Sequence, residues 1–138
     1  MKLSFGMIFS IILIIIFISF AFYAILKFLD LQDSIKIEQF KDNLQNDVDK
    51  MWKGSQGERE VDYSLPSKIE SICFKEDEYE NLFFRSDKFI EGGKIEHIDI
   101  DKILGTKDSF CIENKNNKIK MIIKKDYGEA LVTIEKNE

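Results

Sequence analysis

Two cysteines, Cys73 and Cys111, are the residues whose chemistry bears most directly on how this chain folds and where it works. They stand in two segments, 69–74 and 109–114, that are typical of β-strands. An even pair of cysteines in a small domain indicates an oxidising compartment. A bridge would close a loop of about 39 residues and contribute roughly 3–4 kcal/mol in the chain-entropy model. The alternative is two buried free thiols; we favour the disulfide Cys73–Cys111.

The other reactive side chains do not form a known catalytic or metal-binding motif. His97 is the only histidine, which excludes multi-histidine metal sites and leaves a strand-surface imidazole as the simplest interpretation. The acidic run 76–80 and the pair Asp99 and Asp101 lack the ligand order of an EF-hand. Gly92–Gly93 is not followed by the Lys-Ser/Thr of a phosphate loop. We therefore expect no enzyme activity, no metal, no cofactor and no small-molecule substrate.

Charge excludes one further class of partner. The 138 residues carry 20 basic and 25 acidic side chains, a net charge of -5. Lysines and acids alternate along the chain without the basic stripe that a phosphate backbone requires. Nucleic-acid binding is therefore not expected.

The first 26 residues differ sharply in composition from the rest. From Leu3 to Leu26 there is no charged residue, and Ile and Phe dominate. Such a run forms a helix of about 36 Å, enough for a hydrocarbon core of roughly 30 Å. A cleaved signal sequence has a shorter apolar region and an A-x-A-like site, which this run lacks. We predict a transmembrane helix over 3–27 that contacts the lipid bilayer and is retained.

Residues near both ends of this segment have expected roles. Lys27 marks the bilayer exit because its ammonium group can snorkel, and Tyr23 and Phe28 are suited to the interface. Gly6 and Ser10 form a small-xxx-small pair that allows two helices to approach closely in lipid. The alternative is that these small residues simply face lipid.

The helical period continues beyond the apolar run, and no Gly or Pro interrupts it before Gly54. We predict an amphipathic helix over 28–53, continuous with the transmembrane helix and ended by Gly54. Its apolar side chains are expected to pack on a sheet. The predicted helix–sheet core is Leu31, Ile35, Phe40, Leu44, Val48 and Trp52.

The remaining segment, 54–138, has the alternating period of strands. Its clearest part predicts three strands at about 109–114, 118–125 and 129–135, joined by turns at the sequences NKNN and DYGE. A meander packed on the amphipathic helix would bury the apolar face of each. The predicted fold class is α+β: a transmembrane helix continuing as a long amphipathic helix, followed by a small antiparallel β domain.

The side of the membrane is indicated by two opposing signals. Basic residues are slightly more numerous after the apolar run, which favours a cytoplasmic C-terminal domain. The paired cysteines favour an oxidising exterior. We predict a single-pass protein of the cell membrane with the C-terminal domain outside.

In layout the chain resembles a type IV pilin-like or archaellin-like subunit. The resemblance is carried by the apolar helix 4–28, by its extension 29–52, and by Cys73 and Cys111 in the sheet. It implies a non-enzymatic structural or minor-pilin subunit that self-associates through the N-terminal helix. The alternative is a permanently anchored accessory protein whose outer domain binds another protein.

Overall fold

The computed structural model describes residues 4–137 of the chain. Leu3, where the transmembrane helix is predicted to begin, and Glu138, the last residue of the predicted β domain, lie outside the described residues. The fold is α+β, as predicted. Its elements are α1 (Phe5–Lys53), β1 (Gly57–Ser64), β2 (Ile69–Phe74), β3 (Leu82–Ser86), α2 (Ile100–Leu104), β4 (Phe110–Glu113), β5 (Lys118–Lys125) and β6 (Thr133–Lys136). The chain divides into two compact units, Met1–Ile35 and Lys36–Glu138.

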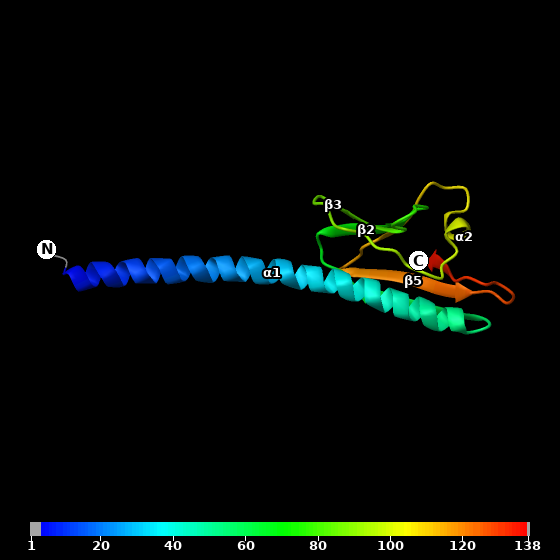
Figure 1. Ribbon diagram of the computed structural model, residues 1–138, viewed down its shortest axis with the longest axis horizontal. Helices are drawn as coiled ribbons and strands as arrows, with labels where there is room; N and C mark the ends of the chain where they lie inside the picture. Colours follow the sequence, from blue (N-terminus) through cyan, green and yellow to red (C-terminus); the bar gives the residue numbers. More distant parts are fainter. Residues whose placement is uncertain (1–3, 138) are drawn as a thin grey trace. The chain divides into compact units, whose positions relative to one another are not determined.

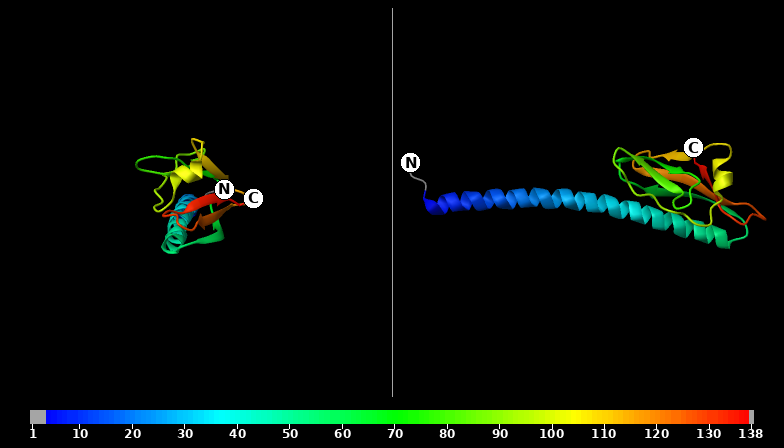
Figure 2. Two further views of the ribbon diagram at one scale, coloured as in Figure 1. Left: turned by 90° about the vertical axis from the view of Figure 1, so that its right-hand side faces the viewer. Right: turned by 45° about the horizontal axis from the view of Figure 1, so that its top comes forward.

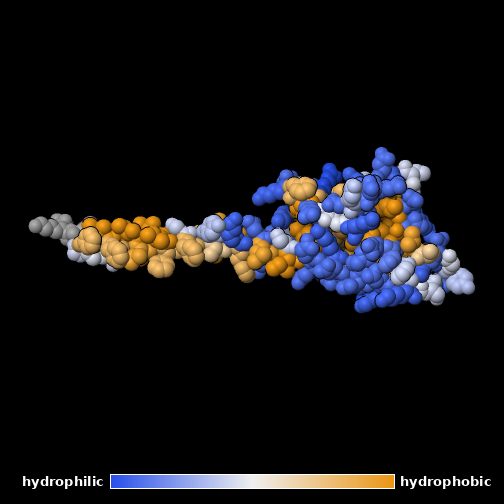
Figure 3. Space-filling model, in the orientation of Figure 1, coloured by the Kyte–Doolittle hydropathy of each residue, from blue (hydrophilic) through white to orange (hydrophobic). Residues whose placement is uncertain are grey.

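The first unit consists of the apolar part of α1. Ser4 caps the helix, since its Oγ accepts a hydrogen bond from the backbone N–H of Met7 at 3.3 Å. Every residue from Ser4 to Gln32 is exposed. Figure 3 shows apolar side chains along this part of the helix. These side chains are therefore not covered by any described part of the chain.

The second unit contains two three-stranded antiparallel sheets, with strand orders β1-β5-β6 and β3-β2-β4. The last part of α1 runs beside β5 (Figures 1 and 2). Phe40 joins the layers, because its ring lies 5.3 Å from that of Tyr63 in the first sheet and 5.9 Å from that of Phe84 in the second. The side chains of α1 that are buried in this core are Ile37, Phe40, Leu44 and Val48.

Phe40, Leu44 and Val48 thus lie where they were expected, but three other predicted core residues do not. Leu31 is 56% exposed, Ile35 46% and Trp52 37%. At 100° per residue, Ile35 points about 140° and Leu31 about 180° away from Phe40 on the helix. Neither Ile35 nor Leu31 can therefore lie on the buried face of α1 that contains Phe40. Trp52 follows the stripe but lies in the last turn of α1, where it contacts a loop.

The predicted C-terminal meander is wrong in one pairing. β4 pairs with β2, in register from Ser71↔Glu113 to Phe74↔Phe110, whereas β5 lies between β1 and β6. The turn itself forms, and Asn116 and Asn117 adopt the positive φ that it needs, 53° and 63°. β4 and β5 belong to different sheets and have already separated where this turn begins. The backbone N–H of Asn114 donates to Glu70, and its side-chain amide to Pro66 and Ile69.

The C-terminus of α1 is held by a buried lysine that sequence reasoning did not single out. Nζ of Lys125 donates to the carbonyl oxygens of Trp52 and Gly54, at 2.7 Å each. These oxygens belong to the group that a helix leaves without partners, and a cation there also suits the helix dipole. Gly54 follows the helix as predicted, but it does not have a positive φ. The helix end is satisfied by a side chain of β5 instead.

Candidate functional site

The predicted disulfide is present and joins two neighbouring strands. Cys73 in β2 faces Cys111 in β4 in direct register, and their sulfur atoms are bonded. Since β4 is only four residues long and pairs with β2 alone, the bond attaches it covalently to the central strand of its sheet. The disulfide is therefore a structural feature of the second unit.

His97 lies in a loop with a φ of 69°, not on the strand surface expected for it. Its Nδ1 is 2.9 Å from Oδ1 of Asp49, and its ring stacks on that of Trp52 with 3.8 Å between centroids. The hydrogen bond from His97, opposed by partial desolvation and supported by one from Gln45, lowers the pKa of Asp49. The histidine thus connects the loop to α1.

A second titratable group, Tyr63 of β1, is buried where this strand packs against α1. Its hydroxyl donates to Oδ2 of Asp47 at 2.6 Å. Burial first, and then this hydrogen bond, raise the pKa of Tyr63 above its ordinary value. The phenol therefore stays protonated and positions the helix on the sheet.

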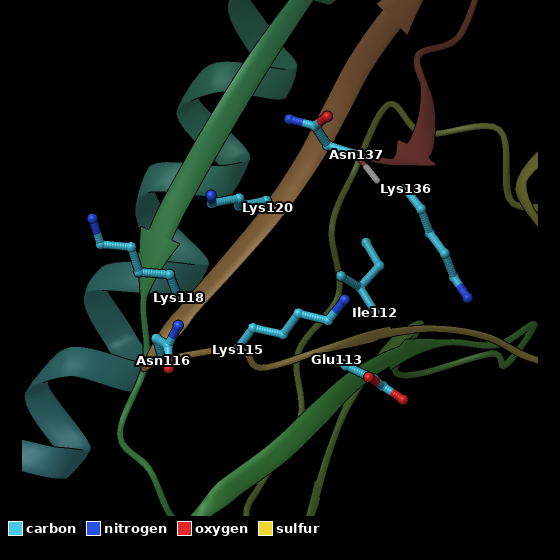
Figure 4. Close-up of a pocket in the computed structure, with 8 residues that line it drawn as sticks. All are labelled: Ile112, Glu113, Lys115, Asn116, Lys118, Lys120, Lys136 and Asn137. Carbon is cyan, nitrogen blue, oxygen red and sulfur yellow. The ribbon is translucent and has the colours of Figure 1, made fainter.

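The second unit has a groove beside β5, with a volume of about 560 Å³. We call it the lysine groove. It is lined by Ile112, Glu113, Lys115, Asn116, Lys118, Lys120, Lys136 and Asn137. Figure 4 shows Lys115 and Ile112 in the middle of the group, with Lys118 and Lys120 on one side of them and Lys136 on the other. The lining thus carries four positive charges and one negative charge, and its one apolar residue, Ile112, is mostly buried.

The groove exists because neighbouring strands end early or diverge. β6 pairs with β5 only from Met121 onwards, so among the described residues Lys120 has β1 as its only strand neighbour. Within residues 4–137, β4 also leaves one edge unpaired, since β2 is its only partner there. Two strand edges without described partners therefore line one hollow, and such edges are common sites of association.

The lysines of the groove lack carboxylate partners. Within residues 4–137, the Nζ atoms of Lys115, Lys118, Lys120 and Lys136 form no ion pair. Lys136 instead lies over the ring of Phe110, 5.7 Å from its centroid. Asp62 lies opposite Lys120 in the strand pairing and Glu113 is part of the lining, but the four lysines outnumber these two carboxylates and so favour a positive local potential that attracts an anionic group. This is notable in a chain whose net charge is -5.

Only part of this site has a sequence signal. Lys118 and Lys120 alternate along one strand, which places both on the same face of β5. Lys136 joins them through the register Met121↔Lys136, and Ile112 and Glu113 through the other sheet. These pairings join segments that are far apart in the sequence, so the alternation of residues within one strand does not predict them.

In the first unit, residues with expected membrane roles make contacts within α1. Nζ of Lys27 lies over the ring of Tyr23, 5.6 Å from its centroid, and Phe28 is exposed. The hydroxyl of Ser10 donates to the carbonyl oxygen of Gly6 at 2.9 Å, which satisfies this polar group inside the helix. In residues 4–137, α1 is the one helix long and apolar enough to cross a membrane, judged by length and composition.

In the described part of the chain, no group of three or more His, Cys, Asp or Glu side chains is placed to hold a metal ion. The structure defines an α+β protein with one long apolar N-terminal helix and a disulfide-linked pair of strands, a layout consistent with a pilin-like fold. Comparisons with protein-family models, curated proteins and solved structures find no match to this chain.

Proposed function

We propose that the protein is a non-enzymatic, single-pass membrane protein that acts as a pilin-like structural or minor subunit. Its apolar helix remains in the cell membrane or in a bundle of such helices, and the disulfide-linked β unit faces the outside. Self-association with further copies is part of this function.

The observation that carries the proposal is the uncovered apolar surface of α1. From Phe5 to Leu26 every side chain is exposed and none is charged. Removing a large apolar side chain from water contributes about 1.5–3 kcal/mol, so a run of this length favours lipid or apolar protein on the order of tens of kcal/mol. The described remainder of the chain does not provide that environment, which supports an external one.

Two further observations support the outside location and the structural role. The Cys73–Cys111 disulfide is a feature of proteins in oxidising compartments. Two titratable groups with shifted pKa values, Asp49 and Tyr63, are engaged in contacts that position α1 on the β unit. Both groups therefore support a structural role rather than a catalytic one.

One residue favours the alternative function, a permanently anchored accessory protein. If a prepilin peptidase cleaved after Gly6, the fifth residue of the mature chain would be Ile11. Pilins typically carry a glutamate at that place. A chain that is never processed would remain a single anchored protein whose outer unit binds another protein.

The experiment that tests the proposal measures processing and location together. Membranes and sheared surface filaments are collected from cells with and without a prepilin peptidase, and the N-terminus of the chain is read by mass spectrometry. A chain that begins at Met7 only when the peptidase is present, and that occurs in the filament fraction, is the expected result. A full-length chain confined to membranes would contradict the pilin-like role and support the accessory one.

Orientation is tested by thiol labelling of the same cells. Because Cys73 and Cys111 are bonded, a membrane-impermeant thiol reagent should label them only after an impermeant reductant has been added outside. Free cysteines that react only after cell lysis would contradict the outside location.

A further inference from the structure

We propose that the lysine groove binds an acidic turn of a second copy of this chain, residues 75–81 between β2 and β3. We call this segment the acidic turn. The inference rests on the proposed self-association and specifies which surfaces of the second unit would meet.

The acidic turn complements the groove in charge. It carries Glu76, Asp77, Glu78 and Glu80, and the first three are exposed. None of the four carboxylates takes part in an ion pair within residues 4–137. The chain thus presents one cluster of carboxylates and one cluster of ammonium groups, and neither cluster forms ion pairs with neighbouring residues of its own copy.

The acidic turn also carries an apolar group suited to the apolar part of the groove. Tyr79 is 77% exposed, and the lining of the groove includes the apolar side chain of Ile112. An aromatic side chain surrounded by charges is a common arrangement for the centre of a protein interface. The acidic turn therefore offers negative charge for the lysines of the groove and an aromatic ring for its apolar part.

Lys115 and Lys118 lie away from the acidic turn of their own copy, whereas Lys136 lies over Phe110, which pairs with Phe74 at the turn's end of β2. The acidic turn follows Phe74 at the end of β2, whereas Asn114, which precedes the groove lysines of the connecting turn, binds Glu70 near its start. The four residue steps from Glu70 to Phe74 span roughly 13 Å along the strand. A contact between the groove of one copy and the turn of the next is head-to-tail. Such contacts continue into rings or filaments.

A second copy is favoured over other anionic partners because the complementary surface is present on the same chain. Anionic lipid would explain the lysines but not the unpaired acidic turn with its exposed tyrosine. Long-range attraction between the two clusters would also orient approaching copies before contact.

The test uses full-length chain reconstituted in vesicles of phosphatidylcholine, which carries no net charge. Equal amounts of unlabelled and 15N-labelled chain are mixed and treated with a carbodiimide, which joins a lysine amine directly to a nearby carboxylate. Peptides that join Lys118 or Lys120 to the acidic turn and contain one labelled and one unlabelled partner are the expected products. Their yield should fall with rising salt.

Charge-reversal variants make the test independent of folding defects. The yield is read at positions that the variants leave unchanged, Lys115 and Lys136 in the groove and Asp77 and Glu80 in the turn. At these positions the groove variant K118E/K120E and the turn variant E76K/E78K should each lower the mixed cross-link yield about tenfold or more, because like charges then face each other. Mixing the groove variant with the turn variant should restore cross-linking, now through the exchanged charges. The matched control K88E/K107E changes two exposed lysines outside the groove and should leave the yield unchanged.

The outcomes separate this inference from the proposed function. Cross-links confined to single copies, or a mixture of the two variants that fails to restore them, would overturn the inference while leaving membrane anchoring intact. Groove-dependent binding of phosphatidylglycerol vesicles without any cross-link between copies would also overturn it, in favour of a lipid site. Mixed cross-links from a chain that cells release without its apolar helix would support the inference and contradict the proposed function.

Discussion

At the scale of single residues, two side chains from distant parts of the sequence hold the last turns of α1. Lys125 binds the terminal carbonyl oxygens of the helix, and His97 binds Asp49 and stacks on Trp52. Both contacts are polar; Lys125 is buried, whereas His97 and Asp49 are partly exposed. Their loss should loosen the end of α1 without removing the apolar core.

Replacing Lys125 by Met tests the first contact. The variant keeps most of the side-chain volume but leaves two carbonyl oxygens without their donor, so we expect the free energy of unfolding to fall by about 1–3 kcal/mol. Chemical denaturation of the full chain in detergent measures this change. The neighbouring variant Lys124→Met, whose lysine makes only a 3.6 Å ion pair with Asp126, should change stability much less. Equal losses in the two variants would contradict the capping role.

The pH dependence of stability tests the second contact. The hydrogen bond from His97 lowers the pKa of Asp49 below 3.8 in the folded state. The stabilisation is therefore present above the unfolded pKa and is lost as the pH falls through the lower folded value. Asp49→Asn should destabilise the chain at pH 5 and have a smaller effect at pH 3, measured by denaturant unfolding. Asp42→Asn, which removes a carboxylate without an ion pair in the described part of the chain, should show no such pH dependence.

At the scale of elements, α1 changes its surroundings while its backbone stays helical. Apart from Trp52, its exposed apolar residues lie before Lys36, and its buried stripe begins at Ile37 and continues every three or four residues. The stripe meets the space between two sheets, where Phe40 contacts one aromatic residue from each. Phe40 is therefore the side chain that links all three layers of the second unit.

Truncating Phe40 to Ala should lower the free energy of unfolding by about 3–5 kcal/mol, since it leaves a cavity between the helix and both sheets. Thermal melts of the full chain in detergent, followed by circular dichroism of the β signal, measure the effect. Ile35→Ala is the matched control on the same helix, and its exposed side chain predicts a change below about 1 kcal/mol. A large loss in the control would show that Ile35 is covered after all.

At the scale of the whole molecule, the chain joins a unit that needs an apolar environment to a unit with a charged surface. Figure 3 shows this contrast as apolar colouring on the first part of α1 and mostly polar colouring on the second unit. The charges of the second unit are not evenly spread, because the lysine groove and the acidic turn separate them by sign. Anchoring and association would thus depend on different surfaces of one chain.

A charge placed in the apolar run tests anchoring. Ile15→Arg puts a cation near the middle of the predicted span, which costs roughly 2.5–3.5 kcal/mol on insertion scales, so the membrane-bound fraction should fall markedly. Carbonate extraction of membranes followed by immunoblotting measures that fraction. Ile35→Arg lies beyond the predicted exit at Lys27 and should leave membrane binding intact. An unchanged fraction in both variants would contradict the transmembrane assignment.

The sequence by itself determined the features that depend on neighbours along the chain. The uncharged run before Lys27 predicted the long apolar helix, because hydropathy and helical period are local properties. Alternation predicted most strands, and the two asparagines of NKNN predicted a turn with positive φ. The pairing of Cys73 with Cys111 was predicted because a small oxidised domain has few other ways to use two cysteines.

Only the tertiary structure decided which segments meet. Asn114 and the disulfide attach β4 to β2, so the predicted meander divides between two sheets and a groove opens beside β5. Lys136 reaches that groove, and Lys125 reaches the end of α1, through contacts with residues far away in the sequence. Such contacts are selected by the total free energy of packing two sheets and a helix together. No local pattern of charge or polarity encodes that sum, which is why the sequence indicates only the shared face of Lys118 and Lys120 and not the groove.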